Sequence, residues 1–220
     1  MLTEFGAHFT DIALWGTKVQ GPRSVVATGG KFRNNEDEIP DTQQVIYEYD
    51  NLILQYSVLH HSSFGPNGDP GAARNGSCGT QFHGTKGTLF VDRAGYRLPP
   101  QYVRLRESRP SQVRPDVWYQ DERFFGFYYT TETRPEYGDS SIQHQAHFRN
   151  FFDCVKSRKD PNSNVESGYY TNTVCRLGDI AYRLGRRIRW DNATEQVFDD
   201  PEANKLVVGT YRSPWIPKGL

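Results

Sequence analysis

The residues best suited to chemistry stand near the start of the chain, in the stretch TEFGAHFTDIALW. Glu4 and His8 are four residues apart and Asp11 follows three residues later, so on a helix all three share one face. A histidine beside a carboxylate suits general acid–base chemistry, because its ordinary pKa is about 6.5. The structural alternative is a His8 satisfied within the fold and a Glu4 that is an ordinary first-turn acid near the helix dipole. Asp11, one turn later, is expected to be structural.

A helix must present these residues, and the surrounding pattern predicts one over residues 4–15, with Gly16 ending it. Its apolar residues Phe5, Phe9 and Ile12 recur at helical spacing. A second stripe of Glu4, His8, Asp11 and Trp15 lies roughly 110° away at 100° per residue. The apolar face is therefore expected to pack, and the second stripe to face something polar.

Strands are expected next. Short β-branched and apolar runs predict strands over 24–28, 43–49 and 52–60, with a tight turn at Asp50 and Asn51 between the last two. The segment TQFHGTKGTLFVD predicts two more strands around a turn at 84–87. Two segments without a clear period are expected to be irregular: a surface or active-site loop over 62–79 and an ordered excursion over 99–140.

The last third reads as helical. Phe148, Phe151, Phe152 and Val155 have the i, i+3, i+4, i+7 spacing of a helix. A short helix is predicted after Asp200 and Pro201. Before it, a longer helix is predicted between a cap at Ser167 and Gly185, with one apolar stripe of Tyr170, Val174, Leu177, Ala181 and Leu184. The order helix, strands, helices predicts an α+β fold, with an open, mainly antiparallel sheet that carries helices on one face.

Composition narrows the class of protein. Lys plus Arg and Asp plus Glu number 26 each in the 220 residues, so no net charge favours nucleic acid or an anionic membrane. No apolar run reaches the roughly 20 residues of a membrane span, and the N-terminus lacks a signal-peptide pattern. We expect a cytoplasmic protein, although a truncated chain would have lost any export signal.

Several site motifs are missing. The sequence contains no GxGxxG after a strand, GxxxxGK[ST], GxSxG or HExxH, so it predicts no nucleotide site of its own. Its three cysteines form no CxxC pair, and no metal is expected. The adjacent His60 and His61 would point to opposite faces of a strand, so only one could reach a pocket.

Several separate stretches, in this order, resemble the C-terminal domain of bacterial Gfo/Idh/MocA oxidoreductases, the family of glucose-fructose oxidoreductase and inositol dehydrogenase. The stretches that carry the resemblance are TEFGAHFTDIALW, FHGTKGTLFVDRAGY, HFRNFFDCVKSRKDPNSNVESGYYTN, RLGDIAYRLGRRIRWD and DDPEANKLVVGTYRSPW. The resemblance is weakest between about residues 99 and 140. It implies that residues 1–220 form a single substrate-binding and oligomerisation domain, without the N-terminal Rossmann domain that binds NAD or NADP in this family.

The resemblance also implies roles for individual residues. Such enzymes place an acid and a histidine four residues apart on the first helix of this domain. His8 matches the histidine and Glu4 the acid, where aspartate is commoner. A base of this kind takes the proton of a sugar or cyclitol hydroxyl while hydride leaves the carbon. Apart from these residues, Asp11 and His61 are the expected substrate contacts, and a structural role is the alternative for Asp11.

Three functions follow as alternatives. The first is the substrate half of an NAD(P)-dependent oxidoreductase, a fragment or split subunit that is inactive alone, binds no cofactor itself and needs a Rossmann-domain partner. A homo-oligomer through the sheet face is expected with it. The second is a non-enzymatic module for self-association or partner binding. The third is a relative that uses the nicotinamide transiently to cleave glycosides.

Overall fold

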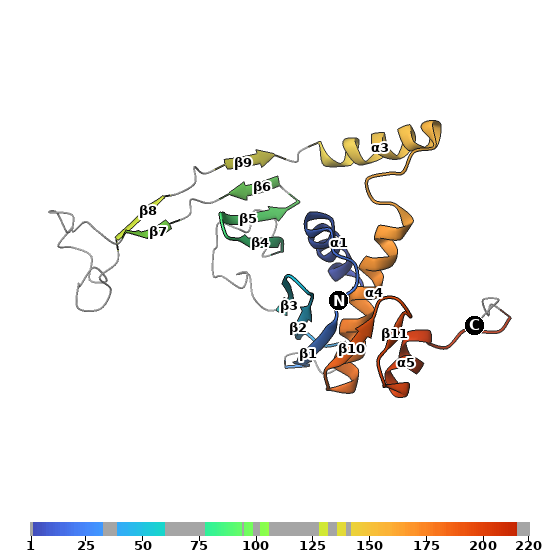
Figure 1. The fold of residues 1–220 in the computed structure, drawn as a ribbon. Coiled ribbons are helices and arrows are strands. Elements are labelled where there is room, and N and C mark those ends of the chain that lie inside the picture. The colour runs from blue at the N-terminus through green and yellow to red at the C-terminus, as the bar shows by residue number, and fades with distance from the viewer. Residues whose placement is uncertain are drawn as a thin grey trace. The chain divides into compact units, whose positions relative to one another are not determined.

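The computed structural model describes residues 2–32, 39–59, 78–93, 95–98, 102–105, 128–131, 136–139 and 142–214. The chain forms two compact units (Figure 1). The first unit joins Met1–Ser77 to Gln145–Leu220, and the second is Cys78–His144. The single substrate-binding and oligomerisation domain over 1–220 stays a prediction.

The first unit is built on a five-stranded antiparallel sheet in the order β11-β10-β1-β2-β3. Its strands are β1 (Ser24–Gly30), β2 (Thr42–Glu48), β3 (Ile53–Leu59), β10 (Ile188–Asp191) and β11 (Gln196–Val197). The predicted turn between β2 and β3 is confirmed, because Tyr49 N–H donates to the Leu52 carbonyl at 3.0 Å across Asp50 and Asn51.

Helices cover one face of this sheet. They are α1 (Phe5–Thr17), α4 (Val165–Leu184) and α5 (Pro201–Val208). Since side chains alternate along a strand, Val25, Val45 and Tyr47 enter the core with residues of these helices, while Val26 and Ile46 between them are exposed. The predicted α+β fold, with an open antiparallel sheet and helices on one face, is confirmed.

The helix α4 supplies most of the helical side of the core. Its buried residues follow the predicted stripe: Val174, Leu177 and Ala181 are at most 1% exposed. The cap, however, is Asn164, whose Oδ1 accepts from Ser167 N–H at 2.9 Å. The prediction of Ser167 as the cap was therefore wrong. The helix begins three residues earlier, because the Asn164 side chain makes the capping bond from the position before the first turn. Gly185 ends the helix in the left-handed conformation, as predicted.

The second unit holds a four-stranded antiparallel sheet in the order β4-β5-β6-β9 and a separate pair, β7 with β8. Its strands are β4 (Thr80–Gly84), β5 (Gly87–Asp92), β6 (Gly95–Leu98), β7 (Tyr102–Leu105), β8 (Tyr128–Thr131) and β9 (Glu136–Asp139). The hairpin of β4 and β5 is confirmed. Strands β7 to β9 fall where irregular structure was expected, because four residues place only two side chains on each face, too few to show a period.

The remaining helix, α3 (Gln143–Ser157), has the predicted apolar spacing. Within the described part of the chain, none of its residues is buried. No described helix is long and apolar enough to cross a membrane.

Candidate functional site

Glu4 and His8 lie one turn apart at the start of α1, and both are exposed. Glu4 precedes the first helical residue, and its carbonyl accepts from Ala7 N–H at 3.2 Å. Its carboxylate makes no capping bond, since glutamate is a poor residue for that position. Glu4 and His8 therefore both stand at the start of α1, and the Glu4 carboxylate does not cap the helix.

The imidazole of His8 contacts an aromatic ring of its own helix. The Phe5 ring lies edge-on to it, with 6.2 Å between the ring centroids. Phe5 and His8 are three residues apart on α1, so this contact stays within the helix. Among the described residues, none is recorded as hydrogen-bonding the imidazole.

The packed face of α1 differs from the predicted one. Gly6, Thr10, Ala13 and Leu14 are buried, whereas Phe5 is 41% exposed. Small residues let α1 approach closely: a Cβ built on Gly6 would lie 3.2 Å from Leu2 Cδ1 and 3.3 Å from the Tyr56 hydroxyl. The prediction of an apolar packing face was wrong because the fit to neighbouring atoms, more than the hydrophobicity of Phe5, decides which side is buried.

Asp11 points to a neighbouring helix. Its Oδ1 accepts a hydrogen bond from Thr171 Oγ1 on α4 at 3.2 Å. The residue before it makes a second contact to α4, because Cys175 Sγ donates to Thr10 Oγ1 at 3.7 Å. Burial raises the pKa of the Cys175 thiol, so this group stays protonated. The remaining predicted site residue, His61, lies outside the described residues, as does His60.

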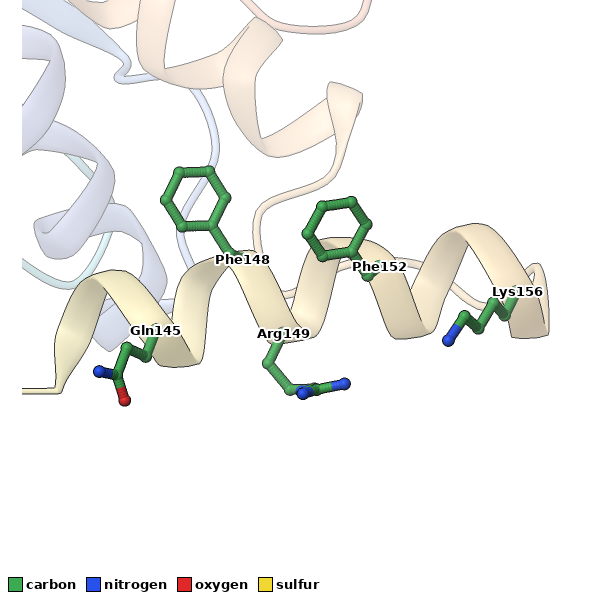
Figure 2. A pocket seen from close by; sticks show the side chains of 5 residues that line it. All are labelled: Gln145, Phe148, Arg149, Phe152 and Lys156. Atoms are coloured by element: carbon green, nitrogen blue, oxygen red, sulfur yellow. The ribbon is translucent and has the colours of Figure 1, made fainter.

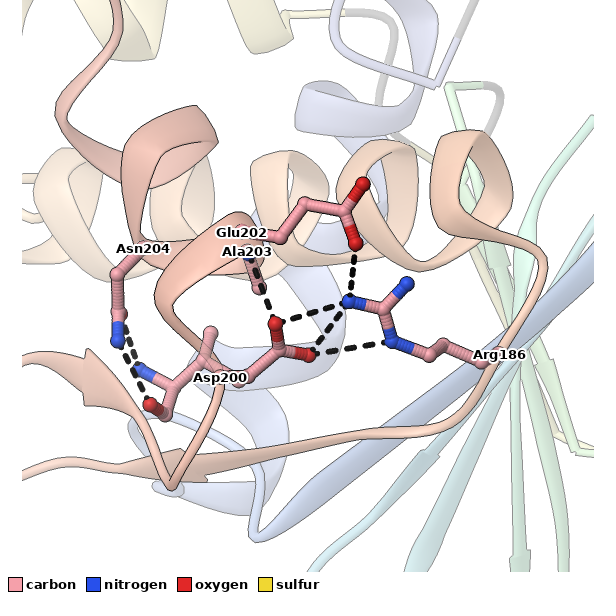
Figure 3. Close-up of polar contacts among 6 residues, drawn as sticks. Arg186, Asp200, Glu202, Ala203 and Asn204 are labelled. Carbon is pink, nitrogen blue, oxygen red and sulfur yellow. Dashed lines mark hydrogen bonds and ion pairs between the residues drawn. The ribbon is translucent and has the colours of Figure 1, made fainter.

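Two arginines, Arg186 and Arg187, form ion pairs within the fold. Arg186 pairs with Asp200 at 2.9 Å and with Glu202 at 2.8 Å (Figure 3). Asp200 also caps α5 by accepting from Ala203 N–H at 3.0 Å, and this bond, followed by Arg186, holds its pKa below the usual range. These partners leave Arg186 unsuited to bind an outside anion.

The second arginine closes one end of the sheet. Arg187 pairs with Glu48 and donates to Ser24 Oγ at 2.8 Å. The Ser24 hydroxyl, followed by Arg187, lowers the pKa of Glu48. The sequence could not predict this pair, because Arg187 and Glu48 are 139 residues apart along the chain.

Two hollows on the described surface lie away from Glu4 and His8. One, of about 340 Å³, lies on α3 and is lined by Gln145, Phe148, Arg149, Phe152 and Lys156 (Figure 2). Figure 2 shows Phe148 and Phe152 on one side of the helix and Arg149 on the other. The other lies along α5, next to Asn204 and Val208. No group of three His, Cys, Asp or Glu that could hold a metal ion occurs in the described ranges.

The residues present do not fit a dinucleotide. Such cofactors bind where a glycine-rich turn joins a parallel strand to a helix. All described strand pairs are antiparallel, and the sequence has no GxGxxG. The described residues can thus supply an acid–base pair but not a nicotinamide site.

Sequence comparison identifies part of the chain. Residues 136–217 match the Gfo/Idh/MocA family of sequences described as "Oxidoreductase family, C-terminal alpha/beta domain". The resemblance seen in the sequence is confirmed over this segment. No curated protein sequence matches the chain.

Solved structures share the fold at low sequence identity. The candidate oxidoreductase YvaA from Bacillus subtilis has a TM-score of 0.53 and 15% identity, over 84% of this chain and 49% of its own. A candidate oxidoreductase from Thermotoga maritima has a TM-score of 0.50 and 16% identity, over 83% and 44%. One from Klebsiella pneumoniae has a TM-score of 0.50 and 14% identity, over 94% and 51%. The chain thus spans about half the length of these proteins.

Proposed function

We propose that this chain, whose residues 136–217 match the C-terminal domain of the Gfo/Idh/MocA oxidoreductases, is the substrate-binding and oligomerisation part of an NAD(P)-dependent enzyme. The substrate class is a sugar or cyclitol, oxidised at a hydroxyl. The observation that carries the proposal is the exposed pair of Glu4 and His8: Glu4 immediately precedes α1, and His8 lies four residues later on it, away from its packed face.

His8 is the proposed base. Oxidation of an alcohol removes the hydroxyl proton and a hydride from the same carbon, and a neutral imidazole can take that proton. Glu4 is proposed to orient the imidazole or to hydrogen-bond a second hydroxyl. Asp11 uses one carboxylate oxygen on Thr171, so a contact to substrate would come from its second oxygen. His61 is the other proposed substrate contact.

The hydride acceptor is proposed to come from outside the described residues. NAD or NADP, held by a Rossmann domain or subunit, would accept the hydride when bound. Within the described residues, proton transfer and substrate orientation are the parts of the reaction that His8 and Glu4 can perform.

The uncovered sheet face is the proposed surface for homo-oligomerisation. Val26 and Ile46 are 42% and 43% exposed and stand opposite one another on β1 and β2. Exposed apolar side chains grouped on one face are typical of protein interfaces. Sedimentation of an Ile46→Glu variant is expected to give a smaller species than the unaltered protein. Val165→Glu, at the 90% exposed first residue of α4 and outside the sheet, serves as the control. Equal masses for all three proteins would contradict this surface.

The catalytic proposal is tested with the chain in the presence of the nicotinamide-binding domain or subunit that accompanies it in the cell. Reduction of NAD⁺ and NADP⁺ is followed with a panel of sugars and cyclitols. We expect His8→Ala to lower kcat by about 10²- to 10⁴-fold, the usual contribution of a general base. The matched control is His147→Ala on α3, which is expected to leave kcat unchanged.

Each other outcome separates an alternative. An unchanged kcat in His8→Ala would contradict the proposed base. Oxidation by the 220-residue chain alone would contradict the need for a partner. Product without net cofactor reduction would indicate glycoside cleavage, and no turnover with any substrate would favour a non-enzymatic module.

A further inference from the structure

Two polar contacts link α1 to α4, one turn apart along α4. Asp11 Oδ1 accepts from Thr171 Oγ1 at 3.2 Å, and Thr10 Oγ1 accepts from Cys175 Sγ at 3.7 Å. Thr10, Thr171 and Cys175 are buried, and Asp11 is half-buried. A charge-assisted bond at a largely desolvated position is more directional than apolar packing.

Apolar packing alone gives α1 little to fix its rotation. Its buried face carries the small residues Gly6, Thr10 and Ala13 and one large side chain, Leu14, near the end of the helix. Small residues allow close contact, but around His8 they provide no large side chain that locks into a hole on the partner. The contacts of Asp11 and Thr10 are therefore the directional restraints nearest to His8.

Rotation of α1 decides where the His8 imidazole points. The Phe5 ring, which contacts the imidazole, belongs to the same helix and turns with it. A side-chain atom lies roughly 5–6 Å from a helix axis, so a rotation of about 20° would move it by roughly 2 Å. Asp11 lies three residues after His8, on the same side of the helix. Anchoring Asp11 therefore anchors the direction of His8.

We propose that Asp11 is a positioning residue, which holds His8 in register by bonding Thr171 on α4. The inference rests on the proposed function of His8, and it assigns to Asp11 a task that needs no contact with substrate. Misplacement of a catalytic group by about 1 Å can lower a rate by up to about 100-fold. Loss of the bond is therefore expected to affect kcat more than KM.

The test removes the Thr171 hydroxyl and then restores it. Thr171→Val is compared with Thr171→Ser and with Thr173→Val, a control that removes a hydroxyl bonded to Tyr169 on the same helix. Asp11→Leu and Asp11→Asn form a second pair, since asparagine keeps an acceptor oxygen. The two readouts are the kcat and KM of hydroxyl oxidation, and the NMR signal of the His8 ring, assigned by its absence in His8→Ala.

We expect Thr171→Val and Asp11→Leu to lower kcat by about tenfold with little change in KM, and to shift or split the His8 ring signal. Thr171→Ser and Thr173→Val are expected to match the unaltered protein in both readouts, and Asp11→Asn to keep the unaltered His8 ring signal. An unchanged His8 signal and kcat in Thr171→Val, with the protein folded, would overturn the positioning role. A shifted His8 signal in a protein that oxidises no hydroxyl would support the anchor and overturn the proposed function instead.

Discussion

The helices α1 and α3 were both predicted from apolar residues at helical spacing, yet they use those residues differently. In α1 the small residues Gly6, Thr10 and Ala13 are buried, and Phe5 of the apolar stripe stays partly exposed. In α3, Phe148, Phe151, Phe152 and Val155 form a clearer stripe, and all four are exposed.

This difference shows that forming a helix and burying one of its faces have different requirements. Apolar periodicity reports that one side of a helix avoids water, but the depth of burial depends on a neighbour that fits. The neighbour of α1 is α4, whose Thr171 and Cys175 meet Asp11 and Thr10. Among the described residues of α3, none is buried.

The largest expected effect contrasts a packed leucine with an exposed phenylalanine. Leu177 on α4 is 1% exposed, and Phe152 on α3 is 53% exposed. Leu177→Ala is expected to lower the free energy of unfolding by about 2–5 kcal/mol, because a cavity opens in the core. Phe152→Ala is expected to change it by less than about 0.5 kcal/mol. Urea unfolding of both variants measures this, and an equal loss in both would show that the apolar side of α3 is buried in solution.

A smaller effect compares two glycines at the two ends of α4. A Cβ on Gly178 would collide with the Tyr47 hydroxyl and Leu2, whereas one on Gly168 would meet nothing within 4 Å. Gly178→Ala is expected to destabilise the protein by about 1–3 kcal/mol through overpacking. Gly168→Ala is expected to stabilise it by about 0.5–1 kcal/mol, because alanine favours the helix. Thermal unfolding tests both signs, and stabilisation by Gly178→Ala would contradict the close packing of α4 against Tyr47 and Leu2.

The smallest effect concerns how helices begin. The side chain of Glu4 makes no cap for α1, whereas Asp200 caps α5 through Ala203 N–H. Asp200→Ala is expected to cost about 1 kcal/mol at pH 7. The pKa of Asp200 is lowered in the fold by the Ala203 N–H and then by Arg186. A lowered carboxyl pKa stabilises the folded state above the ordinary aspartate value of about 3.9, and that stabilisation is lost as the pH falls through the lowered pKa.

Urea unfolding at several pH values between 7 and 2 measures this dependence. The gap between Asp200→Ala and the unaltered protein is expected to narrow below about pH 4. A gap that stays constant down to pH 2 would show that the Asp200 charge contributes nothing.

The sequence predicted best the elements whose signals are local. The stripe of α4, its end at Gly185, the cap of α5 at Asp200 and the hairpin at Asp50 and Asn51 all depend on neighbouring residues. The packed face of α1 was not predictable in this way, because it depends on Leu2, Tyr56 and α4 coming together in space. Periodicity likewise could not find β7 to β9, which are four residues each.

The candidate site was partly predictable for the same reason. The spacing of Glu4 and His8 is local, so the sequence could predict that both stand at the start of the first helix. Their roles stay a prediction. The bond from Thr171 to Asp11 joins residues that are 160 positions apart. No local sequence pattern predicts a contact over that distance.

The central claim is that His8 takes the proton of a substrate hydroxyl, and the most direct measurement is chemical rescue of His8→Ala by imidazole. The initial rate of nicotinamide reduction is measured with and without added imidazole, in the presence of the nicotinamide-binding partner. The account predicts that imidazole raises the rate of His8→Ala and leaves those of the unaltered protein and of Trp15→Ala unchanged. A His8→Ala variant that oxidises substrate at the unaltered rate, and does not respond to imidazole, would contradict it.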